Sequence, residues 1–481
     1  MPTWDALVVA VRASVAIAKP FRKSPISSSK RTLTGLHSTD ALEPIFFRKE
    51  NEEMKRIFIP EKVVFHIESN GEVGTIHDLK SGKRAYVNTD TIEVIQHLLD
   101  EHTIDSFFPA EEIPQKERLE LIRQSESVLR NLVSSGLLTE KKLGKQGLVK
   151  KVTANPPLRV VFAELTKKCN LRCEHCYVPD CNVSEAKANT NSMTFDDIRD
   201  LISQIDELGV MELQLTGGEP FILPYILDII KEAQSRLIPC SVFTNGTLMT
   251  EKIFRYISEN NYGLIFYISL DGYQETHDAF RKHQGAFQKT VTTIKRLLQM
   301  GCDVRINTSI GQHNIAEIRQ FIEFVKNEFG VLHRLVTVEP IGRANAEMTV
   351  SAKEFANLLQ ESGNTFEFLD SHDSIADWTT PACGIGSSML FIDTYSNVSL
   401  CPTLTQRENP EFLAGNITYS SLKDIWENSP VFKKIRGFQC REVEQCNFRE
   451  LCKGGCRSRA YLATGDVNSP DLAMCLLYNA K

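Results

Sequence analysis

KKCNLRCEHCY, residues 167–177, is the stretch that decides the fold. It directly follows an apolar run over residues 159–165, and it places three cysteines within eight residues: Cys169, Cys173 and Cys176. Three thiolates at this spacing can hold three corners of a cubic four-iron cluster and leave the fourth iron open to another ligand. A zinc site would need a fourth protein ligand. His175 lies inside the short Cys173–Cys176 interval, so Cys181 is the better candidate for that role.

Strand and helix patterns alternate through the residues around this loop, 155–345. Short apolar runs typical of buried strands cover residues 159–165, 212–216, 240–244, 264–269, 303–310 and 334–339. Amphipathic stretches typical of helices lie between them, at residues 196–208, 225–236, 252–260, 287–300 and 315–329. This alternation predicts an α/β domain with a parallel sheet, and six strand–helix units predict a partial (β/α)6 barrel. Ligands of such folds bind at the carboxyl ends of the strands, where the cysteine loop begins.

Composition excludes several classes of function. The chain has 481 residues, 42% hydrophobic and 24% charged, and its net charge of −6 gives no reason to expect nucleic acid as a partner. No apolar run approaches the ~20 residues that span a bilayer. Thirteen cysteines in a long chain without a clean secretory signal favour metal ligation over disulfides, and hence a cytoplasmic location. Residues 1–55 are predicted to be a disordered tail, or translation begins at Met54; the basic, Ser-rich composition up to residue 35 would also fit a targeting segment.

CNLRCEHCY resembles the CxxxCxxC signature of radical S-adenosylmethionine (SAM) enzymes, with His175 at the usually aromatic position. The resemblance implies a [4Fe–4S] cluster whose open iron chelates the amino and carboxylate groups of SAM. Reductive cleavage of SAM then yields a 5′-deoxyadenosyl radical, which abstracts a hydrogen atom from the substrate. The second predicted strand ends in a sequence similar to the family's GGE motif: Gly217, Gly218, Glu219 and Pro220. Its glycines would let backbone approach the methionine part of SAM, and Glu219 would accept from the SAM ammonium.

Other strand ends supply weaker candidates for contacts to SAM. Five residues at these strand ends resemble the family's contacts to the ribose and carboxylate of SAM: Thr244, Asn245, Ser269, Asp271 and Asn307. Arg281 is a candidate partner for the SAM carboxylate, and Gly342 resembles a backbone contact to adenine. A Ser or Asn at a strand end is equally well explained as a local cap.

A second group of cysteines lies between residues 380 and 481: Cys383, Cys401, Cys440, Cys446, Cys452, Cys456 and Cys475. They stand in Gly-containing loops with few strong helix or strand patterns, so bound metal would supply much of the folding free energy of this segment. Zinc is the alternative to iron–sulfur chemistry here. Cys181, Cys240 and Cys302 have no assigned role, and apolar packing is the default for each of them.

This second group resembles the SPASM domain, a seven-cysteine extension of radical SAM enzymes. The resemblance implies one auxiliary [4Fe–4S] cluster on Cys383, Cys401 and Cys456. It implies another on Cys440, Cys446, Cys452 and Cys475. The family's usual CxxC step would place a cysteine where Val443 stands, so the fourth ligand of each cluster stays open, and there are one or two auxiliary clusters.

Residues 58–140 predict a small separate domain. Alternating strands at 63–68, 73–78 and 83–87 are followed by helices at 89–99, capped by Thr89, and 119–135, in the order of a winged helix. The segment is not markedly basic, which argues against DNA binding. Because the rest of the chain resembles a SPASM enzyme, residues 58–140 are similar to the PqqD-like precursor-recognition domain of ribosomal peptide maturases. That resemblance implies that a leader peptide adds a strand to an exposed sheet edge.

The N-terminal domain, the CxxxCxxC motif and the Cys-rich C-terminal segment together resemble radical SAM peptide maturases. The long Cys440–Cys446 spacing, followed by NFRELCKGGC, is most similar to that of sactisynthases. We therefore expect an enzyme that joins a cysteine sulfur to an α-carbon in a leader-bearing precursor peptide, with a flavodoxin- or ferredoxin-type electron donor. Alternatives are a formylglycine-forming sulfatase maturase, a tetrapyrrole-modifying enzyme and an iron–sulfur electron carrier. Asp271, Asp393 and Glu339 are candidates for a general base, and nothing in their spacing selects among them.

Overall fold

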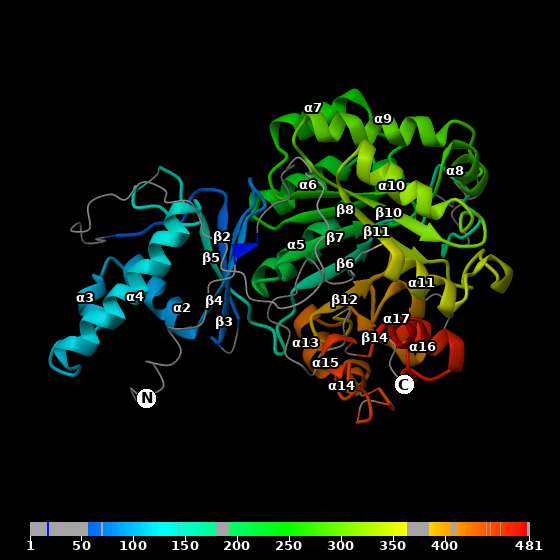
Figure 1. The fold of residues 1–481 in the computed structure, drawn as a ribbon. Helices are drawn as coiled ribbons and strands as arrows, with labels where there is room; N and C mark the ends of the chain where they lie inside the picture. The colour runs from blue at the N-terminus through cyan, green and yellow to red at the C-terminus, as the bar shows by residue number, and fades with distance from the viewer. Residues whose placement is uncertain are drawn as a thin grey trace, which may run out of the picture.

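Two β-sheets organise the chain (Figure 1). The computed structural model describes residues 17–18, 56–68, 71–142, 144–178, 192–362, 384–405, 410–438, 440–442, 444–452 and 454–478. Apart from Ile17–Ala18, residues 1–55 lie outside this part of the chain, as do Cys181, Cys383 and Val443. The expectations for those positions therefore stay predictions.

The larger sheet has nine strands in the order β11-β10-β9-β8-β7-β6-β12-β13-β14. Its central strands are β6 (Val160–Glu164), β7 (Glu212–Thr216), β8 (Cys240–Thr244), β9 (Leu264–Ser269), β10 (Asp303–Ile310) and β11 (Leu332–Thr337). All six are parallel, which confirms the predicted partial barrel. Only β11 is displaced, beginning two residues before its predicted start.

Helices cover the outer face of this sheet (Figure 1): α5 (Phe195–Glu207), α6 (Ile226–Ser235), α7 (Glu251–Glu259), α9 (Ala286–Gln299), α10 (Ile318–Glu328) and α11 (Ala352–Ser362). Helix α8 (Gln274–Arg281) lies at the carboxyl ends of the strands. In α5, Thr194 forms a capping box with Asp197, and Ile198, Leu201 and Ile205 are buried in the common core. Burial of each such side chain contributes roughly 1.5–3 kcal/mol. The five predicted helices are confirmed to within a few residues. Helix α8 was missed because its buried residues include His277, Asp278 and Arg281, which form no apolar stripe.

The N-terminal domain contains the smaller sheet, in the order β1-β4-β3-β2-β5. Its elements are β1 (Ile17–Ala18), β2 (Val63–Ile67), β3 (Val73–Asp78), β4 (Arg84–Asn88), α2 (Thr89–Leu99), α3 (Ile104–Phe107), α4 (Gln115–Ser134) and β5 (Leu148–Lys151). The three predicted strands and two predicted helices are confirmed, although Asn88 caps α2 in place of Thr89. Strand β5 was not predicted; it returns parallel to β2.

This domain packs against the amino ends of the barrel strands. Lys150 donates to Asp206 Oδ1 (2.7 Å) and to the Arg236 carbonyl (2.6 Å), next to the turns that precede β7 and β8. Gly263, just before β9, donates its N–H to the Leu79 carbonyl (2.6 Å). Arg84 on β4 lies 4.0 Å from Glu212, the first residue of β7. The carboxyl ends of the strands are thus left to the cysteine loop.

The C-terminal region extends the barrel sheet. Strand β12 (Met389–Ile392) pairs parallel with β6 and leads into the antiparallel strands β13 (Asn397–Ser399) and β14 (Leu413–Asn416). Helices follow at α12 (Pro402–Thr405), α13 (Leu422–Asn428), α14 (Pro430–Arg436), α15 (Arg449–Cys452), α16 (Arg457–Thr464) and α17 (Leu472–Leu477). Trp426 and Phe432 are fully buried in the same apolar cluster as the barrel. The expectation of little regular structure here was wrong for residues 410–436, because this part shares the barrel's core.

A search of the described residues finds no helix of the length and apolarity that a membrane crossing requires.

Candidate active site

The cysteine loop follows β6 at the carboxyl edge of the barrel. Cys173 is buried, whereas Cys169 and Cys176 are half-buried. None of the three forms a disulfide bond, and neither does any other cysteine within the described residues. Three elements from separate strand ends hold this loop in place: the Gly217–Glu219 segment, the side chain of Arg281, and the Gly342–Arg343 turn.

The two glycines after β7 pack directly on the backbone that precedes Cys169. A Cβ on Gly217 would lie 2.4 Å from the Thr166 carbonyl oxygen, and one on Gly218 would lie 2.2 Å from that of Lys168. Gly218 and Glu219 donate backbone N–H bonds to the same two carbonyls, at 2.6 and 2.9 Å. Any side chain at either glycine would push the loop away, so both are required for its position.

Glu219 ties the end of β7 to the end of β8. It is fully buried: Oε1 accepts from Thr244 Oγ1 (2.7 Å) and Phe221 N (3.1 Å), and Oε2 accepts from Asn245 N (2.8 Å). Burial raises the pKa of Glu219 to about 6, against the lowering effect of these hydrogen bonds. Pro220 then begins a short 3-10 turn, Pro220–Ile222. Thr244, Asn245 and Glu219, predicted separately, form one hydrogen-bonded unit.

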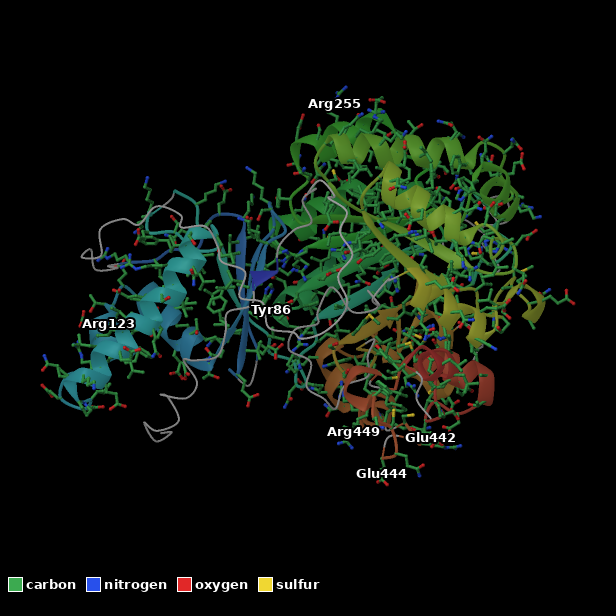
Figure 2. All side chains as sticks on the ribbon, viewed as in Figure 1. Tyr86, Arg123, Arg255, Glu442, Glu444 and Arg449 are labelled. Carbon is green, nitrogen blue, oxygen red and sulfur yellow. The ribbon has the colours of Figure 1, made fainter. Side chains whose placement is uncertain are left out.

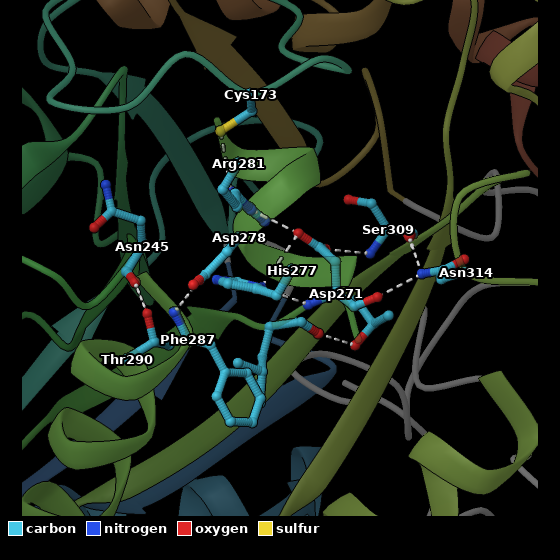
Figure 3. A network of polar contacts seen from close by, with 12 residues as sticks. Cys173, Asn245, Asp271, His277, Asp278, Arg281, Phe287, Thr290, Ser309 and Asn314 are labelled. Atoms are coloured by element: carbon cyan, nitrogen blue, oxygen red, sulfur yellow. Dashed lines mark hydrogen bonds and ion pairs between the residues drawn. The ribbon is translucent and has the colours of Figure 1, made fainter. Parts of the chain in front are cut away.

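Asn245 connects this unit to the cysteine loop. Its Nδ2 donates to Asn170 Oδ1 (3.0 Å) and lies 4.0 Å from Cys169 Sγ. Its backbone carbonyl accepts from Thr290 Oγ1 on α9 (2.8 Å; Figure 3), which fixes the strand end.

Arg281 approaches the loop from α8. Its Nε donates to Asp271 Oδ2 (2.6 Å), and its Nη1 lies 3.6 Å from Cys173 Sγ (Figure 3). Asp271 is fully buried, and its Oδ1 accepts from Ser309 N (3.0 Å). Burial opposes ionisation of Asp271, but the Arg281 guanidinium outweighs it and holds the pKa of this carboxyl well below its usual range. Two predicted residues, Asp271 and Arg281, are therefore an ion pair that supports Cys173.

The third clamp is the turn after β11. A Cβ on Gly342 would lie 2.4 Å from the Cys176 carbonyl oxygen. Arg343 donates its backbone N–H to that same oxygen (3.0 Å) and its Nε to the Cys173 carbonyl (2.9 Å). Sequence analysis missed Arg343, since a lone arginine in a turn after a strand carries no distinctive pattern.

Three aromatic rings stack beside the loop. The His175 ring lies 4.3 Å from Phe280, and Phe280 lies 3.4 Å from His313, all nearly parallel. Burial lowers the pKa of His175 to about 3 and that of His313 to about 4, so both rings are neutral at pH 7. Sequence analysis did not foresee this stack, because its members come from three distant segments.

Ser269 and Asn307 lie further along the barrel wall. They are register partners on β9 and β10, and Arg334 on β11 is the next partner in the same row. Their side chains therefore share one face of the sheet. Asn307 Oδ1 is buried without a hydrogen-bond partner among the described residues.

Electrostatic interactions between thiols link four of the C-terminal cysteines, and the ligand sets that the resemblance implies stay predictions. Burial raises the pKa of Cys475 to about 11, helped by the nearby thiols of Cys440 and Cys446; Cys475 in turn helps raise that of Cys452. These four thiols therefore lie near one another. The backbone N–H of Cys456 donates to Asp471 Oδ2 (2.8 Å). Cys401 is buried just before α12.

The segment that carries Cys440, Cys446 and Cys452 reaches the outer end of the molecule. Glu442, Glu444 and Arg449, on the same segment, project from the outer end of the C-terminal region (Figure 2). Cys240 and Cys302 are buried away from them, as expected for packing residues.

The candidate bases differ in how they are bound. Asp271 is paired with Arg281, as described above. Asp393 closes the β12–β13 turn, with Oδ1 accepting from Tyr395 N (2.8 Å) and Asn397 N (2.9 Å). Glu339 is half-buried after β11 and accepts from Thr337 Oγ1 (2.5 Å); desolvation raises its pKa.

The donor set fits iron–sulfur clusters better than single ions. Within the part of the chain that the structure describes, no three His, Cys, Asp or Glu converge closely enough to hold one metal ion. A cubic cluster places each thiolate on a different iron, so its ligands need not converge. Sulfur atoms that receive N–H donors, as those of Cys169 and Cys173 do, suit such a cluster. When bound, it would supply the electron that cleaves SAM.

Comparison with known proteins bears on both cysteine sites. Residues 163–325 match the radical SAM superfamily, and residues 383–457 match SPASM, an iron–sulfur cluster-binding domain. The chain is 28% identical over 340 residues to an AdoMet-dependent heme synthase of Methanosarcina barkeri, covering 64% of this chain and 93% of the relative. It is 30% identical over 312 residues to the antilisterial bacteriocin subtilosin biosynthesis protein AlbA of Bacillus subtilis, covering 62% of this chain and 67% of that relative.

Among solved structures, Streptococcus suis SuiB bound to S-adenosylmethionine superimposes with a TM-score of 0.61, covering 86% of this chain and 99% of that one at 14% identity. SuiB bound to its precursor peptide SuiA gives 0.60. The chain therefore belongs to the radical SAM superfamily, enzymes whose core domain binds a [4Fe–4S] cluster and SAM, and it carries a SPASM domain that binds auxiliary iron–sulfur clusters.

Proposed function

We propose that this enzyme modifies a ribosomally made precursor peptide, forming a thioether between a cysteine sulfur and an α-carbon. The observation that carries the proposal is the N-terminal sheet, whose β4 edge accepts an added antiparallel strand. Ile17 and Ala18 pair there with Ala85 and Arg84. A leader peptide would take the same edge in the same direction, by β-augmentation.

The identity of the domain as a PqqD-like recognition module is part of this proposal. In its favour, β2, β3 and β4 form a meander followed by three helices, attached to a radical SAM barrel. A small sheet with its own apolar core is a stable platform for a peptide. Its attachment through Lys150, Glu68 and Arg84 would hold the peptide at a fixed distance from the cysteine loop.

The proposal assigns a role to each group of site residues. Cys169, Cys173 and Cys176 hold the cluster that cleaves SAM, and Arg281, Asn245 and the two glycines keep those thiols in place. The polar wall around Ser269, Asn307 and Arg334 contacts SAM or the peptide backbone. The electron donor is a flavodoxin or ferredoxin.

The names of two relatives agree with a peptide substrate. AlbA is a bacteriocin biosynthesis protein, and SuiB was solved with its precursor peptide. The heme synthase match favours a second candidate, modification of a tetrapyrrole side chain. The match covers 93% of the heme synthase but only 64% of this chain. More than a third of this chain therefore has no counterpart in that relative. A sheet that binds a leader peptide would have no role in the modification of a tetrapyrrole.

Anaerobic coexpression with a precursor peptide encoded beside the gene tests the chemistry. We expect the peptide to lose two hydrogens per modified site, and we expect Cys173→Ala to abolish that loss. SAM cleavage with an unchanged peptide mass would refute the crosslinking proposal for that peptide.

A second experiment tests the docking edge in the full chain. Proline cannot supply the ladder N–H, so Ile17→Pro with Ala18→Pro should free the β4 edge. We expect the dissociation constant for the precursor, measured by fluorescence anisotropy, to fall. An unchanged constant would argue against docking at β4.

A further inference from the structure

One buried carboxylate in the barrel lacks the hydrogen bonds that its neighbour makes. Glu164 is the last residue of β6 and is fully buried. Neither of its side-chain oxygens has a hydrogen-bond partner of ordinary geometry among the described residues. Glu219, at the end of the neighbouring strand, is equally buried but accepts three hydrogen bonds. Burying a poorly partnered carboxylate is unfavourable, so such a group points to a role outside the fold.

The surroundings of Glu164 come from three elements. On β7, its register partner is Thr216. From the cysteine loop, the Lys167 ammonium and the Tyr177 ring lie near it, and Lys167 also lies over the Tyr395 ring at 4.6 Å. From the end of β12, Asp393 and the backbone N–H of Thr394 face it.

This environment keeps the carboxyl ready to exchange a proton near neutral pH. Burial raises the pKa of Glu164 to about 7. The Lys167 ammonium and the Thr394 amide pull the value down, and Asp393 pushes it up. A base of this kind is matched to work at physiological pH.

Its position is also suitable. Glu164 lies at the carboxyl ends of β6 and β7, five residues before Cys169 and close to Tyr177, which directly follows Cys176. It therefore stands between the cysteine loop and β12, the strand that leads into the SPASM domain. Ligands of parallel α/β folds bind at this edge.

We infer that Glu164 is the catalytic base that takes the proton released by the peptide substrate. The inference rests on the proposed function. A 5′-deoxyadenosyl radical removes one hydrogen atom from the α-carbon, giving 5′-deoxyadenosine and a carbon radical. Formation of the carbon–sulfur bond then breaks the thiol S–H bond and releases one proton and one electron. The proton goes to the Glu164 carboxylate, and the electron goes to a one-electron acceptor of the iron–sulfur class.

The other candidates are less suited to this step. Asp271 is held ionised by Arg281, and the oxygens of Asp393 are used in its turn. Glu339 faces Arg459 and Asp471 of the C-terminal region and accepts from Thr337. Glu164 alone among these four is buried without a hydrogen bond of ordinary geometry.

The test compares Glu164→Gln with wild-type enzyme under anaerobic conditions. We expect peptide affinity and 5′-deoxyadenosine formation to be retained, while crosslinked product per 5′-deoxyadenosine falls ~100-fold, the usual scale for loss of a general base. The wild-type product rate should rise between about pH 6 and 8, and the Glu164→Gln rate should be flat. Glu164→Asp should restore part of the product, and Asp393→Asn should move the rise in rate to lower pH, because it removes a charge that raises the pKa of Glu164.

Three outcomes would overturn parts of this scheme in distinguishable ways. An unchanged product ratio and pH profile in Glu164→Gln would refute the base assignment. Weakened peptide binding with an unchanged ratio would also refute it and make Glu164 an anchor for the substrate. Absence of product from the wild-type chain, with SAM still cleaved, would refute the proposed function and the base assignment with it.

Discussion

The two cysteine regions of this molecule are built in different ways. Cys169, Cys173 and Cys176 stand on one loop that glycine contacts and two arginines clamp against the barrel. The C-terminal thiols stand on short pieces such as the four-residue helix α15, with local contacts such as Arg441 N to the Asn468 carbonyl (2.9 Å). We therefore expect protein packing to form the first site before metal binds. We expect the second to depend on its metal for much of its order.

The boundary between these two kinds of construction runs inside the C-terminal region. Residues 410–436 bury Trp426 and Phe432 in the barrel core, and Trp426 Nε1 donates to the Pro156 carbonyl (2.7 Å). Residues 440–478 carry five of the seven C-terminal cysteines; among their described residues, Ala473 is buried in that core, and Tyr461, Val467 and Leu477 pack against it. The C-terminal region thus consists of a part that packs on the barrel, residues 410–436, and a part that carries most of the cysteines, residues 440–478.

The largest expected effect separates the two sites by function. We expect Cys173→Ala to reduce SAM cleavage below detection, because the cluster loses one of three ligands. Cys475→Ala should leave 5′-deoxyadenosine formation measurable and abolish only peptide modification. Chromatographic quantification of 5′-deoxyadenosine with dithionite as reductant makes the measurement. Equal loss in both variants would show that the two regions are not independent.

Removal of iron should separate them by stability. We expect chelation to raise amide hydrogen exchange ~100-fold or more in residues 440–478 and to leave β6 to β10 protected, because only the former need metal to fold. Mass-spectrometric exchange on the reconstituted and chelated protein gives the comparison. Uniform deprotection would mean that the barrel also depends on its cluster.

The Arg281–Asp271 pair measures how strongly protein contacts hold the first site. Arg281→Met leaves Asp271 buried without its partner, so we expect a loss of about 3–5 kcal/mol in unfolding free energy. Arg296→Met, which removes an exposed pair with Glu251, should cost less than about 1 kcal/mol. Calorimetry of both variants measures the two losses in unfolding free energy. Similar small losses would show that the clamp contributes little.

The smallest effect concerns Glu164 and depends on pH. Its pKa is raised in the folded state, so the stability tied to its protonated form is lost as pH rises from the ordinary carboxyl range through about 7. Glu164→Gln should therefore match wild type near pH 5 and exceed it by up to about 3 kcal/mol at pH 8. Melting temperatures of wild type and of Glu164→Gln across this range check the sign. A difference that is constant with pH would contradict it.

Sequence patterns predicted most of the barrel because its strands are apolar runs separated by amphipathic helices. They failed where tertiary contacts decide the structure. Helix α8 has a polar buried face, and β12 pairs with β6 across more than 200 residues. Among candidate site residues, the cysteines and glycines were found because spacing and residue type identify them. Arg343, His313 and Glu164 were missed, because what distinguishes them is burial and neighbours that no local pattern encodes.

The seating of the N-terminal domain sets a minimum length for any peptide that it holds. Arg84 on β4 contacts Glu212 at the start of β7, while Glu164 pairs with Thr216 at the end of that strand. The strand rises about 3.3 Å per residue, so the two levels are separated by about 13 Å. An extended peptide needs at least about four residues to cover that distance and more to pass around the barrel wall. The enzyme would act as a ruler, counting residues from the docked segment before any side chain is modified.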